Sequence, residues 1–159
     1  MSTRSSKPDR GPLLGSLVRI VHTHNVARLA AWLASSGYDD LQPAHGAALQ
    51  PLRDAPEGAR ITTLARAARI TKQSMSALVD HLERAGYVER VADPFDARAV
   101  RVRLTARGRA YSRAARAFAH SIEADWVERI GAQRVEALRD ALEHLHRSLQ
   151  ASDAMANGD

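Results

Sequence analysis

The sequence lacks cysteine and long apolar runs, and it has very little lysine. Without cysteine, the 159-residue chain has no disulfide bonds and no thiolate metal ligands. Its most apolar early stretch, residues 12–21, is interrupted by Arg19 and is too short to span a bilayer. A signal peptide over residues 13–35 is excluded by His22, His24 and Arg28 within that stretch. We therefore expect no contact with membranes and a cytoplasmic, nucleoid-associated protein.

Because lysine occurs only as Lys7 and Lys72, nearly all of the positive charge behind the net +5 is arginine. A guanidinium group donates two parallel hydrogen bonds, which suits phosphate and base-edge recognition. An arginine-rich proteome explains the same bias, so charge alone does not identify a nucleic-acid-binding protein. With 45% hydrophobic and 26% charged residues, the composition is typical of one globular domain with extensions.

Residues 61–86 predict two short helices joined by a tight turn. Thr62 or Thr63 offers a hydroxyl to cap the first helix, and Ile70 closes the turn. Thr71 caps a second helix that runs to about Ala85, and Gly86 is expected to end it in a left-handed conformation. Its buried stripe consists of Met75, Leu78, Val79 and Leu82. Its outward face consists of Lys72, Gln73, Ser76, Ala77 and Asp80. This pattern, with a small, polar and basic outward face, predicts a DNA-binding helix-turn-helix.

Two alternating stretches follow, at residues 87–91 and 100–104, and they predict two strands. Residues 93–98 between them are rich in turn formers and end in Arg98. We therefore expect a two-stranded ribbon with a basic tip, which makes the motif a winged helix-turn-helix.

The wing and the end of the second helix carry a family pattern. Asp96-Ala97-Arg98 at the expected wing tip is followed by Leu104-Thr105, and residues 78–90 read LVDHLERAGYVER. These motifs resemble the MarR family of bacterial transcriptional regulators. The resemblance implies a mostly α fold with a small two- or three-stranded β-wing and a helical dimerisation region formed by both ends of the chain. It also implies that Asp96 holds the wing or Arg98 in position.

We expect the helix that begins at Thr71 to enter the major groove. Gln73 can pair with adenine, while Lys72 and nearby hydroxyls reach phosphates, and Arg98 reaches into the minor groove. Ala77 occupies a position where many members of the family carry a long polar side chain, so direct base readout is expected to be thinner here. The predicted DNA-binding residues are Thr63, Thr71, Lys72, Gln73, Ser74, Ser76, Ala77, Asp96 and Arg98, with Arg90, Arg101 and Arg103 as secondary candidates.

Long helices are expected on both sides of this motif, over residues 13–35, 105–130 and 132–150. Thr105 caps the second and Gly131 ends it. The last helix spaces its apolar residues like a coiled-coil seam. One alternative is that this seam packs against the chain's own first helix. We favour a seam between two copies of the chain, because a homodimer supplies the two-fold symmetry of a palindromic operator. The dimerisation residues are expected to be Leu17, Phe118, Trp126, Val135, Leu138, Leu142, Leu145 and Leu149.

The expected organisation is a disordered tail (1–11), N-terminal helices (12–53), a winged helix-turn-helix (54–104), C-terminal helices (105–150) and a polar tail (151–159). Family precedent adds a small-molecule effector pocket, for which His22, Trp32, His45 and Tyr111 are candidates; ordinary core is the alternative for Trp32 and Tyr111. The histidine spacings do not indicate a metal site, and no cofactor or enzymatic motif is evident. The alternatives to a ligand-responsive repressor are non-specific chromatin binding and a protein-interaction module.

Overall fold

The computed structural model describes the backbone of residues 11–156 and the side chains of residues 11–151 except Ala97. Most of the tail expected over residues 1–11 and the last residues, 157–159, lie outside this range. The chain divides into two compact units, one ending at Ser112 and one beginning at Arg113. The confirmed fold class is a mostly α winged helix-turn-helix. None of the helices in residues 11–156 combines the length and hydropathy that a bilayer crossing requires.

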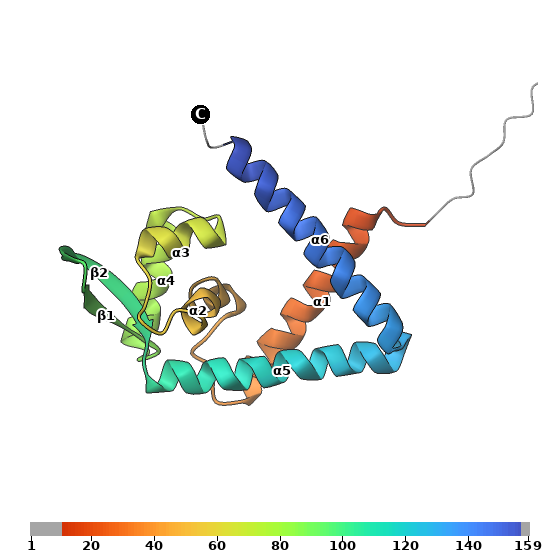
Figure 1. Cartoon of the computed structure of the whole chain (residues 1–159). Coiled ribbons are helices and arrows are strands. Elements are labelled where there is room, and N and C mark those ends of the chain that lie inside the picture. The colour runs from red at the N-terminus through yellow and green to blue at the C-terminus, as the bar shows by residue number, and fades with distance from the viewer. Residues whose placement is uncertain (1–10, 157–159) are drawn as a thin grey trace, which may run out of the picture. The chain divides into compact units, whose positions relative to one another are not determined.

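The first unit contains the winged helix-turn-helix (Figure 1). Its helices are α1 (Leu14–Ser35), the 3-10 turn η1 (Pro43–His45), α2 (Gly46–Arg53), α3 (Ile61–Ala68) and α4 (Lys72–Arg84). The strands β1 (Val88–Asp93) and β2 (Asp96–Leu104) pair antiparallel. The side chains that are almost wholly buried are Tyr87, Leu33, Leu52, Leu64, Met75, Leu82, Val79, Val88 and Val102. The core thus joins α4 to both strands.

Helix α4 is bounded as its sequence predicts. Thr71 precedes it in an extended conformation, and its Oγ1 accepts the Ser74 N–H at 3.0 Å. Gly86 follows with φ +77°, the left-handed conformation that glycine adopts without steric cost. Met75, Val79 and Leu82 are wholly buried, so the expected stripe anchors the helix.

Helix α3 begins earlier than expected. The prediction that Thr62 or Thr63 caps it is wrong, because Arg60 is the N-cap and no side chain caps the helix. The reason lies in the preceding residue: Ala59 exchanges two backbone hydrogen bonds of 2.9 Å with Val102 of β2. This bridge fixes the extended chain up to Ala59, and the helix starts directly after it.

Helix α2 runs through Pro51 and ends at Arg53, the predicted bound of the N-terminal helices, with Leu49 and Leu52 buried on either side of the proline. The end of the last helix differs from expectation. The last helix does not end at Gln150 but continues to Ala156, into the segment expected to be a polar tail. The residues it adds include three alanines and a methionine, which are good helix formers.

The turn of the wing is tighter than the sequence suggests. Asp93 pairs with Asp96, while the neighbouring Ala92 pairs with Val100, so residues 97–99 form an irregularity in β2. Pro94 and Phe95 therefore make the turn, and Arg98 lies in the irregular segment beside it. The expectation of a basic residue at the tip itself is wrong, because the exposed tip is an aromatic side chain.

The second unit contains most of α5 (Ala106–Ile130) and all of α6 (Ala132–Ala156), which meet at Gly131 (Figure 1). Gly131 has φ +86° and ends α5 as expected. Thr105 caps α5 as expected, since its Oγ1 accepts the Gly108 N–H at 3.1 Å.

Candidate nucleic-acid interface

The first turns of α4 present polar groups to solvent, while Met75 in the same turns is buried. The hydroxyl of the N-cap Thr71 is hydrogen-bonded to the Ser74 hydroxyl, with Oγ1 and Oγ 2.8 Å apart. The predicted DNA-binding residues that are exposed are Thr63, Thr71, Lys72, Gln73, Ser74, Ala77, Arg98 and Arg103. Those that are half-buried are Ser76, Asp96, Arg90 and Arg101. The N-terminus of a helix carries unpaired N–H groups and partial positive charge, both of which favour phosphate.

Two histidines support the other end of α4. His81 on this helix donates its Nε2–H to the Asp40 carbonyl at 2.9 Å and stacks on His45, with ring centroids 4.4 Å apart. His45 is buried, and its Nδ1 accepts the Gln42 N–H at 2.9 Å. Burial lowers the pKa of His45, and the neighbouring His81 lowers it further, while Asp40 acts in the opposite direction. Helix α4 therefore packs against η1 through two stacked imidazoles.

The predicted candidate Arg90 is bound to acids of α4. Its guanidinium group contacts Asp80 Oδ1 at 2.5 Å and also pairs with Glu83. The arginine therefore joins β1 to α4. These ion pairs compensate its charge, which reduces what it can contribute to phosphate binding.

Arg101 and Arg103 lie on one face of β2, since they pair in register with Val91 and Glu89 of β1. Each is bound to a carboxylate: Arg103 Nε lies 2.8 Å from Glu89, and Arg101 Nε lies 3.1 Å from Asp93. Neither is therefore an uncompensated cation.

Asp93 is a site residue that sequence reasoning missed. Its side chain has no exposed area; it accepts the Phe95 N–H at 3.0 Å and binds Arg60 Nε at 2.8 Å as well as Arg101. The Phe95 N–H, then Arg60, then Arg101 stabilise the carboxylate and lower its pKa to about 2, against an opposing effect of burial. Arg60 also reaches Asp96 at 3.2 Å. This cluster, Arg60, Asp93, Asp96 and Arg101, is called the wing clamp below.

Three cations near the predicted interface differ from these paired arginines in having no ionic partner among the described side chains. Arg66, Lys72 and Arg98 have exposed side chains, and within residues 11–151 these side chains make no ion pair or hydrogen bond. Arg98 is held only through its backbone, whose N–H donates to Asp96 Oδ1 at 3.1 Å. Arg66, on the surface of α3, was not predicted. The sequence feature that could have indicated it is a basic residue in the first helix of the motif.

A network around the buried Tyr87 connects the start of the wing to the start of α5. Tyr87 is fully buried; its hydroxyl donates to Asp40 Oδ1 at 2.7 Å and accepts from Arg107 at 3.0 Å. Arg107 also binds Asp40 Oδ2 at 2.8 Å and lies 4.3 Å from the centre of the Tyr87 ring. Burial, followed by Asp40, raises the pKa of Tyr87. The network fixes the base of the wing.

The residues proposed for an effector pocket are only partly brought together. Trp32 and Tyr111 have ring centroids 6.3 Å apart, within an aromatic cluster that includes Tyr38. His45 is instead stacked on His81, and His22 is exposed on α1. Within residues 11–151, no group of three or more His, Asp or Glu side chains is placed to hold a metal ion.

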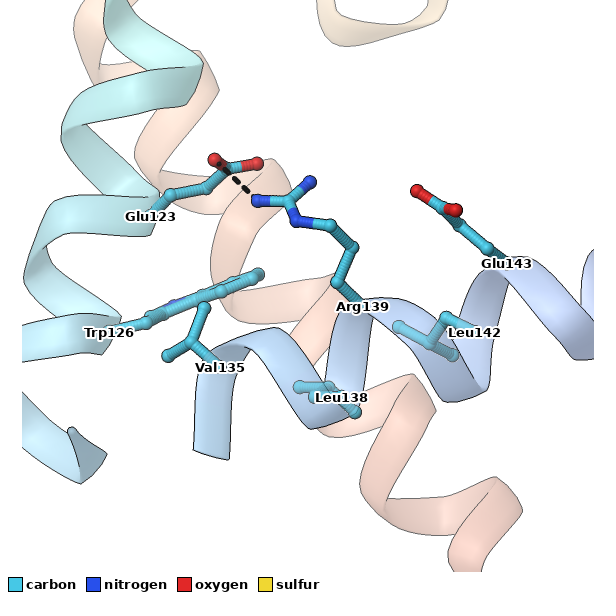
Figure 2. Close-up of a pocket in the computed structure, with 7 residues that line it drawn as sticks. All are labelled: Glu123, Trp126, Val135, Leu138, Arg139, Leu142 and Glu143. Atoms are coloured by element: carbon cyan, nitrogen blue, oxygen red, sulfur yellow. Dashed lines mark hydrogen bonds and ion pairs between the residues drawn. The ribbon is translucent and has the colours of Figure 1, made fainter. Parts of the chain in front are cut away.

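In the second unit, α5 and α6 enclose an apolar groove of about 250 Å³ (Figure 2). Glu123 of α5 and Arg139 of α6 form an ion pair of 3.0 Å across it, beside Trp126. Val135 and Ile122 are buried in this unit. Four residues of the predicted seam are 43–52% exposed: Leu138, Leu142, Leu145 and Leu149.

Comparisons with known proteins identify the class of protein to which the fold belongs. Residues 39–99 match the model of the MarR family. None of the curated proteins matches the chain in sequence. A crystal structure of MarR is similar with a TM-score of 0.80 at 21% identity, covering 94% of this chain and 99% of that one. FabT of Streptococcus pneumoniae, crystallised in complex with DNA, is similar with a TM-score of 0.76 at 19% identity, covering 87% and 96%. The fold is that of winged helix DNA-binding transcription regulators.

A further similarity shows the family itself. The MarR family protein Rv2887 of Mycobacterium tuberculosis, solved with salicylic acid, is 31% identical; the match covers 86% of this chain and 98% of that one, with a TM-score of 0.65. The chain belongs to the MarR family and is a transcription regulator of that family. This is a class of DNA-binding regulators rather than of enzymes.

Proposed function

We propose that the protein is a homodimeric, ligand-responsive repressor that binds an inverted-repeat operator. The observation that carries the proposal is that some basic side chains of the motif are paired with carboxylates and others are not. Lys72 and Arg98 are exposed without an ion pair in residues 11–151, at the start of α4 and beside the turn of the wing. The neighbouring arginines of the wing are bound to carboxylates. Uncompensated charge is thus available at the two places where the motif meets a major and a minor groove.

The first turns of α4 enter the major groove in this proposal. Gln73 pairs with adenine there, Lys72 meets a phosphate, and Arg98 enters the adjacent minor groove. FabT and the MepR protein of S. aureus were both crystallised with DNA, at 19% and 21% identity to this chain. That similarity supports double-stranded DNA as the partner.

The salt dependence of binding tests the DNA contact. Arg98→Ala should weaken binding and lower the slope of log affinity against log salt by about 1, because one fewer phosphate counterion is released. Arg103→Ala is the matched control, since Arg103 is exposed on the same strand but paired with Glu89. Equal slopes for Arg98→Ala and the wild type would refute the assignment of Arg98.

The exposed leucines of α6 support a homodimer. Leu138, Leu142, Leu145 and Leu149 are spaced for a helical seam and remain about half exposed in the single chain. A second copy covers this apolar surface and gives the two-fold symmetry that an inverted repeat matches.

Leu142→Glu should convert the dimer to a monomer that binds DNA weakly, as measured by light scattering and by titration with DNA. His144→Glu adds a carboxylate two residues away, on the opposite side of the same helix, and should remain a dimer. A Leu142→Glu variant that stays dimeric at micromolar concentration would rule out this seam.

A small organic ligand is proposed to release the operator. The similarity to Rv2887, which was solved with salicylic acid, supports an effector of this size. Trp32 and Tyr111 are the candidate contacts, because they form an aromatic cluster within the first unit. The alternative is sequence-indifferent chromatin binding, in which an inverted repeat and unrelated DNA of equal length bind with equal affinity.

A further inference from the structure

Phe95 is a large apolar side chain that the protein holds out into solvent. It is 86% exposed, the highest value among the described large hydrophobic residues of the chain. It occupies the turn between β1 and β2, where a polar residue or glycine would close the hairpin without exposing an aromatic ring. At this exposure the ring contributes little to the core of the first unit.

The wing clamp fixes the position of this ring. Asp93 accepts the Phe95 N–H at 3.0 Å, and its carboxylate is held by Arg60 and Arg101. The Arg101 guanidinium carbon lies 5.7 Å from the centre of the Phe95 ring, within the range of a cation–π contact. The backbone and the ring are therefore both oriented before any partner arrives.

The charges around the ring favour a polyanionic partner over an apolar one. The carboxylates of Asp93 and Asp96 are matched by Arg60 and Arg101. Arg98, in the irregular segment next to the turn, adds an uncompensated positive charge. An exposed aromatic ring beside an uncompensated arginine suits the minor groove, whose walls are apolar sugars and whose edges are phosphates.

We infer that Phe95 is an apolar DNA contact, which inserts into the minor groove beside Arg98 and makes affinity depend on the deformability of the base step beneath the turn. The inference rests on the proposed function. Minor-groove proteins use phenylalanine wedges in this way, and the wedge favours steps that open easily, such as TA and CA. The ring reads the shape of the groove, whereas Arg98 supplies charge.

The test uses the full-length protein and a fragment that the wild type selects from genomic DNA. Phe95→Ala should weaken binding about tenfold, the effect of losing much of the burial of a phenyl group. Its salt dependence should keep the wild-type slope, because an apolar contact releases no counterions. Val100→Ala is the matched control: Val100 is a 49% exposed apolar residue on the same hairpin, farther from the turn.

The salt slope separates a contact from a structural role. If Phe95→Ala lowered the slope as Arg98→Ala does, the wing would have shifted and Phe95 would be structural, which overturns the inference. Unchanged affinity for Phe95→Ala also overturns it. Phe95→Leu should restore part of the affinity. If the wild type selects no specific fragment, it is the proposed function that fails, and this result is distinct from either outcome for Phe95.

Discussion

Gly108→Ala should destabilise the protein, although the same substitution in most helices stabilises it. Gly108 lies in the first turn of α5, and a methyl group there would come within 2.0 Å of the Tyr87 carbonyl oxygen and 3.2 Å of Leu104 Cδ2. The Tyr87 carbonyl cannot move freely, because it accepts the Thr105 N–H at 3.0 Å. Tyr87 is itself wholly buried at the base of the wing.

The expected magnitude follows from two opposing effects. Alanine improves helix propensity by about 1 kcal/mol over glycine. Forcing an extra methyl group into a packed site costs about 1–3 kcal/mol, and a backbone contact this close belongs at or above the upper end. We expect a net loss of about 2 kcal/mol and a fall in Tm of about 4–8 °C for a chain of this size. DNA affinity should fall too, since β1 begins at the residue after Tyr87.

The assay is thermal unfolding followed by circular dichroism at one fixed protein concentration, because dimerisation makes Tm concentration-dependent. Gly46→Ala is the matched control: Gly46 is helical, and its added methyl would meet only the Gln50 side chain at 3.5 Å. That variant should melt at or slightly above the wild-type temperature. A Gly108→Ala variant as stable as Gly46→Ala would refute the described packing of α5 on Tyr87.

Three further predictions concern α4 and its supports. Thr71→Ala should lower the free energy of unfolding by about 1 kcal/mol through loss of the N-cap, as measured by urea denaturation, with Thr71→Ser close to wild type. Lys72→Ala should lower the salt slope of DNA binding by about 1, while Arg90→Ala, whose charge is already paired, should leave it unchanged. The folded state lowers the pKa of His45 below its ordinary value of 6.5. The contribution of this histidine to stability should therefore be complete above pH 6.5 and decline as the pH falls below it. Urea denaturation at pH 7.5 and 5.5 should show this loss, and His45→Gln should reduce it; an equal loss in that variant would contradict the assignment.

The features that the sequence predicted correctly depend on local signals. The cap at Thr71, the stop at Gly86 and the cap at Thr105 each involve residues within a few positions of one another, and all three are present. The family motif likewise led to Arg98, whose side chain is exposed. Its use in DNA binding stays a prediction.

The features that sequence reasoning missed depend on contacts between distant parts of the chain. Arg60 and Asp93 are 33 residues apart, and the pairing of Ala59 with Val102 spans a still longer separation. The first contact helps to tighten the wing turn, and the second sets the start of α3. No periodicity reveals either, because ladder hydrogen bonds and ion pairs of this kind require the fold to bring their partners together.

The paired charge on Arg90 and Arg101 shows the same limit. A count of arginines in the wing suggests a broadly basic surface, yet the acids that bind them lie on α4 and at the wing turn. Only the folded arrangement distinguishes these arginines from Lys72 and Arg98. The candidate DNA contacts are therefore fewer than the sequence indicates.

The most direct test of a sequence-specific dimeric regulator is selection of bound fragments from the source genome, with wild type and Arg98→Ala in parallel. We predict that the wild type recovers fragments sharing one inverted repeat, and that Arg98→Ala recovers the same fragments more weakly. Genes next to the recovered site would then indicate the class of effector to examine. Recovery of DNA with no shared repeat by the wild type would contradict the account and favour non-specific binding.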